Sequence, residues 1–146
     1  ATRAGTAPLP VGAMIETPAA ALRSAEMADA SAFLSIGSND LTQLTLGLSR
    51  DDTEARLIAR YVDGGLVDAS PFERLDDAVV ALIERAVSAA PTASWSLCGE
   101  HGADEWSVRA VRRAGVGAVS CSPYRVPIAR LAAGRAAAAE LAGEVA

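Results

Sequence analysis

Four short apolar segments, each followed by polar residues and then a helix-like stretch, constrain the fold of this 146-residue chain most strongly. They are residues 11–16, 33–37, 93–98 and 117–121. Strands that alternate with helices pair in parallel, because each crossover returns the chain to the same end of the sheet. The alternation therefore predicts an α/β fold with parallel strands, either a small doubly wound sheet or part of a (β/α)8 barrel.

Helical patterns fill the intervals between these strands. Thr17 is a good N-cap and Pro18 a good first helical residue, while Gly115 is typical of a helix end. Residues 75–90 carry apolar side chains at helical spacing. The predicted helices are residues 20–30, 53–62, 75–90, 104–114 and 126–141.

The length of the chain fits about half of a barrel. A complete (β/α)8 barrel needs about 250 residues, so four βα units supply roughly half of one. We expect residues 11–146 to form this partial barrel domain and residues 1–10 to be a leader or linker. The absence of an initiating Met suits a processed product or an excised piece.

Composition narrows the classes of function. The formal charge is −5, the pI is about 4.8, and the basic residues are scattered, which argues against nucleic acid as the main partner. No apolar run approaches the roughly 18–20 residues that span a bilayer, so no membrane segment is expected. Cys98 and Cys121 are too few for a disulfide scaffold and fit a reducing cytoplasm.

Polar residues gather where the predicted strands end. They are Glu16, Asn39, Asp40, Cys98 and either Ser120 or Cys121. The carboxyl ends of parallel strands meet at one edge of the sheet, and ligands bind at that edge in such folds. Four successive strands that deliver polar groups to one edge predict a binding site there.

Each of these residues also has a structural alternative. Glu16 and Asp40 could hold Mg²⁺ or simply cap the helices that follow them. Asn39 could donate to a carboxylate or adopt a left-handed turn. Cys98 could be a thiol poised for proton transfer or a small buried apolar residue. His101, the single histidine, fits a structural hydrogen-bonding role.

Several motifs resemble one enzyme family. They are Val-Gly-Ala-Met-Ile-Glu-Thr-Pro at 11–18, Ser-Ile-Gly-Ser-Asn-Asp-Leu-Thr-Gln at 35–43, Gly-Leu-Ser-Arg-Asp-Asp at 47–52, Cys-Gly-Glu-His-Gly at 98–102, and residues 120–131. Together they resemble the pyruvate phosphate dikinase branch of the phosphoenolpyruvate-utilising enzymes, which also include phosphoenolpyruvate synthase and enzyme I of the sugar phosphotransferase system. The resemblance implies the C-terminal half of the (β/α)8 (TIM) barrel that binds phosphoenolpyruvate or pyruvate.

The resemblance also implies roles for the residues at the strand ends. Glu16 and Asp40 correspond to Mg²⁺ ligands that also contact substrate, and Cys98 to the catalytic acid/base that protonates enolpyruvate at its methylene carbon. His101 and Glu100 would shape the surroundings of Cys98. The resemblance also implies that substrate is bound through backbone, amide and guanidinium groups of Gly37, Ser38, Asn39 and Arg50.

This resemblance leaves the activity of the chain by itself open. It implies a phosphotransferase (kinase) that would need ATP-binding and phosphohistidine domains from elsewhere. Expected partners are phosphoenolpyruvate or pyruvate and either a second copy in a homodimer, a complementary half-barrel or a phosphohistidine domain. The alternatives are a non-catalytic half-barrel module and a subunit like phosphoenolpyruvate synthase or enzyme I. A small enzyme for another 2-oxo acid would need extra positive charge, for which Arg125 and Arg130 are candidates.

Overall fold

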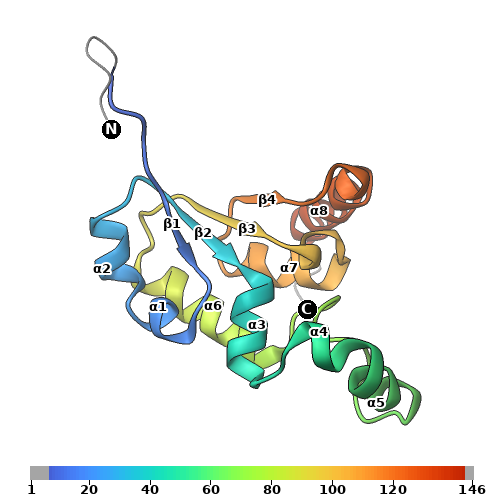
Figure 1. Cartoon of the computed structure of the whole chain (residues 1–146). Coiled ribbons are helices and arrows are strands. Elements are labelled where there is room, and N and C mark those ends of the chain that lie inside the picture. The colour runs from blue at the N-terminus through green and yellow to red at the C-terminus, as the bar shows by residue number, and fades with distance from the viewer. Residues whose placement is uncertain (1–6, 144–146) are drawn as a thin grey trace.

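A parallel β-sheet forms the centre of the computed structural model, which describes residues 7–143 (Figure 1). Within those residues, four strands lie in the order β1-β2-β3-β4, and every neighbouring pair is parallel. A doubly wound sheet reverses its strand order at a switch point, whereas this one does not. The predicted α/β fold, four βα units of a half-barrel, is confirmed. The strands are β1 (Ala13–Ile15), β2 (Leu34–Gly37), β3 (Trp95–Cys98) and β4 (Ala118–Ser120).

Helices follow every strand. The crossovers contain α1 (Pro18–Leu22), α2 (Ser24–Asp29), α6 (Asp77–Ala89) and α7 (Glu105–Arg113), and α8 (Val126–Leu141) follows β4. The long β2–β3 connection also carries α3 (Ser38–Leu46), α4 (Arg50–Thr53), the π-helix η1 (Glu54–Ile58) and α5 (Ala59–Asp63). Two 3₁₀ turns, η2 (Glu100–Ala103) and η3 (Pro123–Arg125), follow β3 and β4. No described helix has the length and apolar character needed to cross a membrane.

One face of the sheet packs against helices and forms the core. Successive side chains of a strand point to opposite faces, so alternate residues are buried together. Apolar side chains from the sheet meet those of α6, which lies beneath the strands beside α1 and α7 (Figure 1). The fully buried members include Ile15, Leu34, Ile36, Leu97, Val79 and Ile83.

The opposite face carries small or polar side chains. We call it the open face, and it consists of Met14, Ser35, Ser96, Cys98, Ala118 and Ser120. The strand register places Met14, Ser35, Ser96 and Ala118 in one row across the sheet, and Gly37, Cys98 and Ser120 in the next. The side chains of the open face are half-buried or exposed, so this face is available to a ligand or another protein surface.

Most predicted helix signals are confirmed, with two differences. The Thr17 hydroxyl accepts a hydrogen bond from the Ala20 amide at 3.0 Å, and Gly115, with φ of 102°, follows α7. The single helix predicted for residues 20–30 is instead two short helices separated at Arg23. Residues 38 and 39, which lie outside every predicted helix, are the first residues of α3, because β2 runs directly into that helix.

The prediction for residues 1–10 is only partly covered by the structure. Residues 1–6 lie outside the described part of the chain, and residues 7–10 have no regular secondary structure. The division into a leader and a domain beginning at residue 11 therefore stays a prediction.

Candidate functional site

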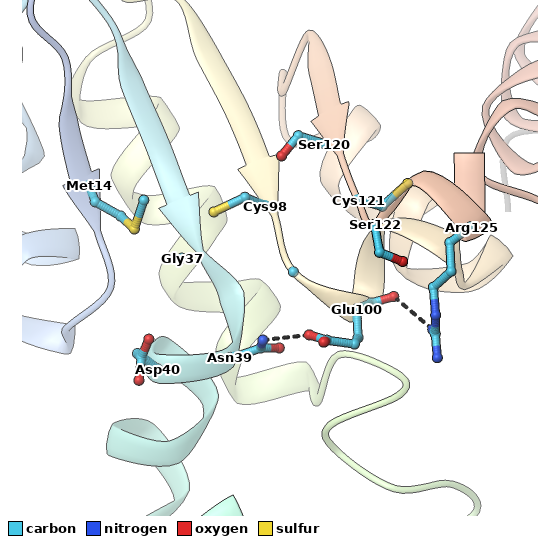
Figure 2. Close-up of a pocket in the computed structure, with 11 residues that line it drawn as sticks. Met14, Gly37, Asn39, Asp40, Cys98, Glu100, Ser120, Cys121, Ser122 and Arg125 are labelled. Atoms are coloured by element: carbon cyan, nitrogen blue, oxygen red, sulfur yellow. Dashed lines mark hydrogen bonds between the residues drawn. The ribbon is translucent and has the colours of Figure 1, made fainter.

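A pocket of about 310 Å³ opens at the carboxyl ends of the four strands (Figure 2). Four of the predicted site residues line it, namely Gly37, Asn39, Asp40 and Cys98. They come from the ends of β2 and β3 and from the first turn of α3. The remaining lining residues are Met14, Gly99, Glu100, Ser120, Cys121, Ser122 and Arg125.

Glu16 lies beside this pocket at the end of β1. A Cβ atom built on Gly37 would lie 2.9 Å from Glu16 Oε2, so the carboxylate extends over the Gly37 backbone. Only glycine leaves room for it there. The alternative that Glu16 caps the next helix is wrong, because Thr17 caps α1.

Asp40 reaches the same pocket from the first turn of α3. Its Oδ1 atom accepts a hydrogen bond from Gln43 Nε2 at 3.2 Å, and its side chain is exposed. The alternative that Asp40 caps this helix is also wrong, since Gly37 occupies the N-cap position without a side-chain bond. Within the described residues, no three His, Cys, Asp or Glu side chains gather into a metal cluster.

Ser38 and His101 form a buried hydrogen-bonded pair behind the pocket. Ser38 Oγ lies 2.9 Å from the Cys98 carbonyl oxygen and 2.8 Å from His101 Nδ1. His101 Nε2 lies 2.8 Å from the Pro71 carbonyl oxygen. A carbonyl only accepts, so in the neutral ring Nε2 carries the proton and donates to Pro71. The single hydroxyl proton of Ser38 then serves one acceptor at a time, either the Cys98 carbonyl oxygen or His101 Nδ1. Burial lowers the pKa of His101 below its ordinary value of 6.5, although the Pro71 carbonyl opposes the shift.

This pair holds the backbone at the end of β3. Both side chains are fully buried, and neither lines the pocket. Gly99, with φ of 127°, lies against Ser38, and a Cβ atom on Gly99 would collide with Ser38 Oγ. The prediction that Ser38 contacts substrate is not tested by these contacts, which show it bonded to Cys98 and His101.

Cys98 presents its thiol to the open face at the centre of the pocket (Figure 2). Its Sγ atom lies 3.4 Å from the Ile36 carbonyl oxygen, a distance suited to a weak S–H donor. The side chain is half-buried and is not part of the apolar core. Cys121 is also half-buried and lines the pocket.

Asn39 and Arg50 are joined by a carboxylate of the chain itself. Asn39 Nδ2 donates to Glu100 Oε2 at 2.5 Å, and Arg50 Nη1 lies 3.5 Å from Glu100 Oε1. Asn39 does not adopt the left-handed turn considered above, because every positive-φ residue in the described chain is glycine. Its Oδ1 atom is buried without a hydrogen-bond partner and faces Gly99.

Sequence patterns did not single out every residue of the pocket. Met14 lies on β1, two residues before Glu16, so the two-residue periodicity of a strand was the signal for its position. Ser122 follows β4, but a lone serine after a strand carries little information. Arg125 was considered only for its charge, and the structure places it at the rim with Nη1 3.5 Å from the Glu100 carbonyl oxygen.

Together these features define a class of domain. It is a parallel α/β half-barrel with a pocket at the carboxyl ends of its strands. Carboxylates, a thiol, an amide and arginines all lie at or beside this pocket.

Comparison with known proteins identifies the family. A family model described as PEP-utilising enzyme, PEP-binding domain, matches residues 2–138, and the chain belongs to this family. The chain is 47% identical over 131 residues to pyruvate, phosphate dikinase of Rhizobium meliloti (strain 1021), which covers 86% of the chain. It is 46% identical over 132 residues to pyruvate, phosphate dikinase of Clostridium symbiosum, which covers 87% of the chain.

A plant relative shows the same pattern. Pyruvate, phosphate dikinase 1, chloroplastic, of Oryza sativa subsp. japonica is 47% identical over 128 residues, or 84% of the chain. The matched regions make up 14%, 15% and 13% of the bacterial and rice proteins, respectively. The chain thus spans about one seventh of the length of the curated relatives it matches.

Proposed function

We propose that the pocket binds phosphoenolpyruvate or pyruvate with Mg²⁺, and that Cys98 exchanges a proton with the substrate's methylene carbon. The chain would act as one part of a pyruvate phosphate dikinase-type phosphotransferase. The observation that carries this proposal is the convergence of Gly37, Asn39, Asp40 and Cys98 on one pocket. The names of the family and of its dikinase members support the substrate class.

The residues present fit Mg²⁺. This ion is usually held by one or two carboxylates, and water and substrate oxygens complete its coordination. Glu16 and Asp40 provide two carboxylates, one over Gly37 and one exposed at the pocket wall. When bound, Mg²⁺ would supply positive charge that stabilises the negative charge developing on the enolate oxygen.

The side chains around Cys98 would position the substrate for proton transfer. We assign the substrate's anionic groups to the amide of Asn39, which lines the pocket, and to the guanidinium of Arg50, which pairs with the lining residue Glu100. The thiol of Cys98 stands on the neighbouring strand and would give its proton to, or take one from, the methylene carbon. Ser38 and His101 would hold the Cys98 backbone in place.

A calorimetric titration with oxalate, an enolpyruvate mimic, tests the metal assignment. We expect binding that depends on Mg²⁺ and is lost in Glu16→Gln and Asp40→Asn, because each variant removes a charged oxygen ligand. Asp63→Asn is the matched control, since Asp63 is exposed at the end of α5, away from the pocket-lining residues. Equal affinity in the wild-type chain and both pocket variants would refute the metal assignment.

Exchange of the pyruvate methyl protons in D₂O tests the role of Cys98. The exchange rate is followed by proton NMR with Mg²⁺ present. We expect this rate to fall at least about 100-fold in Cys98→Ser, which is the usual contribution of general acid–base catalysis. Serine keeps a donor for the Ile36 carbonyl, so the fold should be unchanged. Retention of oxalate binding with no exchange in the wild-type chain would instead favour a non-catalytic binding module.

A cytoplasmic location belongs to the same proposal. Cys98 and Cys121 are both free thiols, as a reducing compartment would leave them. If the location is reducing, a thiol reagent should label both cysteines in freshly isolated protein under non-reducing conditions.

A further inference from the structure

Glu100 occupies the donors to which the proposed function assigns the substrate's anionic groups. Its Oε2 atom accepts from Asn39 Nδ2 at 2.5 Å, and its Oε1 atom lies 3.5 Å from Arg50 Nη1. Both carboxylate oxygens are therefore engaged. The residue lies immediately after Gly99 and is itself part of the pocket wall (Figure 2).

Glu100 is charged but remains accessible. The hydrogen bond from Asn39, with a smaller contribution from Arg50, lowers the pKa of Glu100 below its ordinary value of 4.5, although partial burial opposes the shift. The side chains of Arg50 and Glu100 are 33% and 35% exposed. Solvent therefore reaches both partners of this ion pair, and Glu100 also lines the pocket.

The donors around Glu100 come from separate elements. Asn39 lies in α3, Arg50 begins α4, and Arg125 ends η3 with its Nη1 atom 3.5 Å from the Glu100 carbonyl oxygen. Side chains from three parts of the chain thus converge on one residue whose carboxylate resembles the anionic end of a small acid. The same donors cannot serve two carboxylates at once with the same geometry.

We propose that Glu100 is an internal competitor for anionic ligands, whose carboxylate holds Asn39 and Arg50 and must be displaced when a ligand binds. This inference rests on the proposed function and concerns the same site. In this proposal Glu100 sets the affinity of the pocket for ligands. The sequence resemblance implied only that Glu100 shapes the surroundings of Cys98. A ligand would have to present an anionic group with at least two oxygens to replace both contacts.

The Glu100→Gln variant distinguishes competition from simple positioning. Glutamine keeps an acceptor for Asn39 but removes the charge that holds Arg50. Oxalate, titrated in the presence of Mg²⁺, should bind the variant about two- to fivefold more tightly, given the usual strength of exposed ion pairs. If Glu100 only positions Asn39 and Arg50, the variant will bind oxalate more weakly than the wild-type chain, and the proposal is overturned.

A second substitution identifies the released group. We expect Arg50→Gln to remove the gain when it is combined with Glu100→Gln, because Arg50 is the donor whose contact with Glu100 the first change weakens. A gain that persists without Arg50 would overturn its assignment as the displaced partner. Glu105→Gln is the control for loss of one negative charge, since Glu105 pairs with Arg135 outside the pocket.

Measurements on the wild-type chain provide an independent test. The side-chain amide signals of Asn39 in a nitrogen–proton NMR spectrum should shift when oxalate displaces Glu100, and signals that remain unchanged at saturation would overturn the proposal. Circular dichroism reports whether Glu100→Gln is folded, and Glu100→Ser serves in its place if it is not.

The outcomes separate this inference from the proposed function. Tighter binding to Glu100→Gln with no binding to the wild-type chain would support the inference and refute ligand binding by the unmodified pocket. Weaker binding to the variant would refute the inference and leave the proposed function standing. No binding to either protein would overturn both.

Discussion

At the scale of single residues, His101 shows how a buried titratable group can be tied to the backbone of the site. It is the single histidine of the sequence and is fully buried. Its two ring nitrogens lie within hydrogen-bond distance of Ser38 Oγ and the Pro71 carbonyl oxygen, and the neutral ring donates its one proton to Pro71. Glu100 and Asp104 favour the charged ring, while Arg50 opposes it, but burial is the largest effect on its pKa.

Stability should depend on pH because of this histidine. The folded-state pKa is lower than the unfolded value of about 6.5, so the unfolded chain binds the proton first as the pH falls. The free energy of unfolding is therefore expected to be highest above that value. Between pH 7.5 and 5.5 it should decrease, by at most about 1.4 kcal/mol per pH unit for one proton.

Urea unfolding at both pH values measures this effect. The control is His101→Gln, which has no group that titrates in this range and should show a nearly constant free energy of unfolding. If the wild-type chain and the variant lose stability equally, the dependence does not come from His101.

At the same scale, sequence and structure differ mainly in which partners each residue has. The positions of Asn39, Asp40 and Cys98 followed from the strand ends, because parallel strands bring their carboxyl ends together. The bond from Asn39 to Glu100 did not follow. It joins residues separated by 61 positions, and only the closed β2–β3 crossover brings them together.

At the scale of elements, the four short apolar segments of the sequence located every strand to within a few residues. The strands of the structure are shorter than the predicted segments because pairing ends where the chain turns into helices or loops. The helix α3 was not predicted, since Ser38, Asn39 and Asp40 resemble a polar loop. Tertiary packing selects the helix by burying Leu41 and Thr42.

The last helix offers a test of local propensity. Gly134 lies inside α8 and is exposed, and a Cβ atom there would meet no other atom within 4 Å. Gly134→Ala should therefore raise the free energy of unfolding by about 0.5–1 kcal/mol, because alanine loses less backbone entropy. Thermal unfolding followed by circular dichroism measures the change.

The reverse substitution on the same helix is the matched control. Ala138 is also exposed on α8, and Ala138→Gly should lower stability by a similar amount. An unchanged melting temperature in both variants would show that α8 does not unfold together with the rest of the domain.

At the scale of the whole molecule, the sheet ends in two unpaired edges. Within the described residues, β1 and β4 each have one neighbouring strand, and the open face is not covered by helices. Tyr124, Ile128 and Leu131 are 94%, 55% and 61% exposed, respectively. Their spacing of four and three residues puts them on one side of the helical segment formed by η3 and α8. Unpaired edges and exposed apolar side chains favour association with another protein surface.

We expect the 146-residue chain to self-associate through these edges at micromolar concentration. Two half-barrels related by a two-fold axis could pair β4 of each copy with β1 of the other and so close the sheet. Light scattering during size-exclusion chromatography would then give the mass of a dimer. A monomer at every concentration tested would rule out the homodimer and favour a complementary half-barrel as the partner.

A charged residue on the edge strand tests the surface involved. Ala118 is exposed on β4, and Ala118→Lys should shift the chain to a monomer, because a lysine discourages pairing at a strand edge. Ala138→Lys places the same charge on an exposed position of α8 and should leave the mass unchanged. If both variants lost association equally, the interface would lie on α8 and not on the edge of β4.

The contacts behind and beside the pocket also determine when it can form during synthesis. Ser38 meets Cys98 and His101 across 60 and 63 positions, and Asn39 meets Glu100 across 61. A nascent chain that has left the ribosome only as far as Ala90 contains both predicted metal ligands but none of these three partners. Ser38 and Asn39 therefore gain these contacts only after the segment from Cys98 to His101 has left the ribosome.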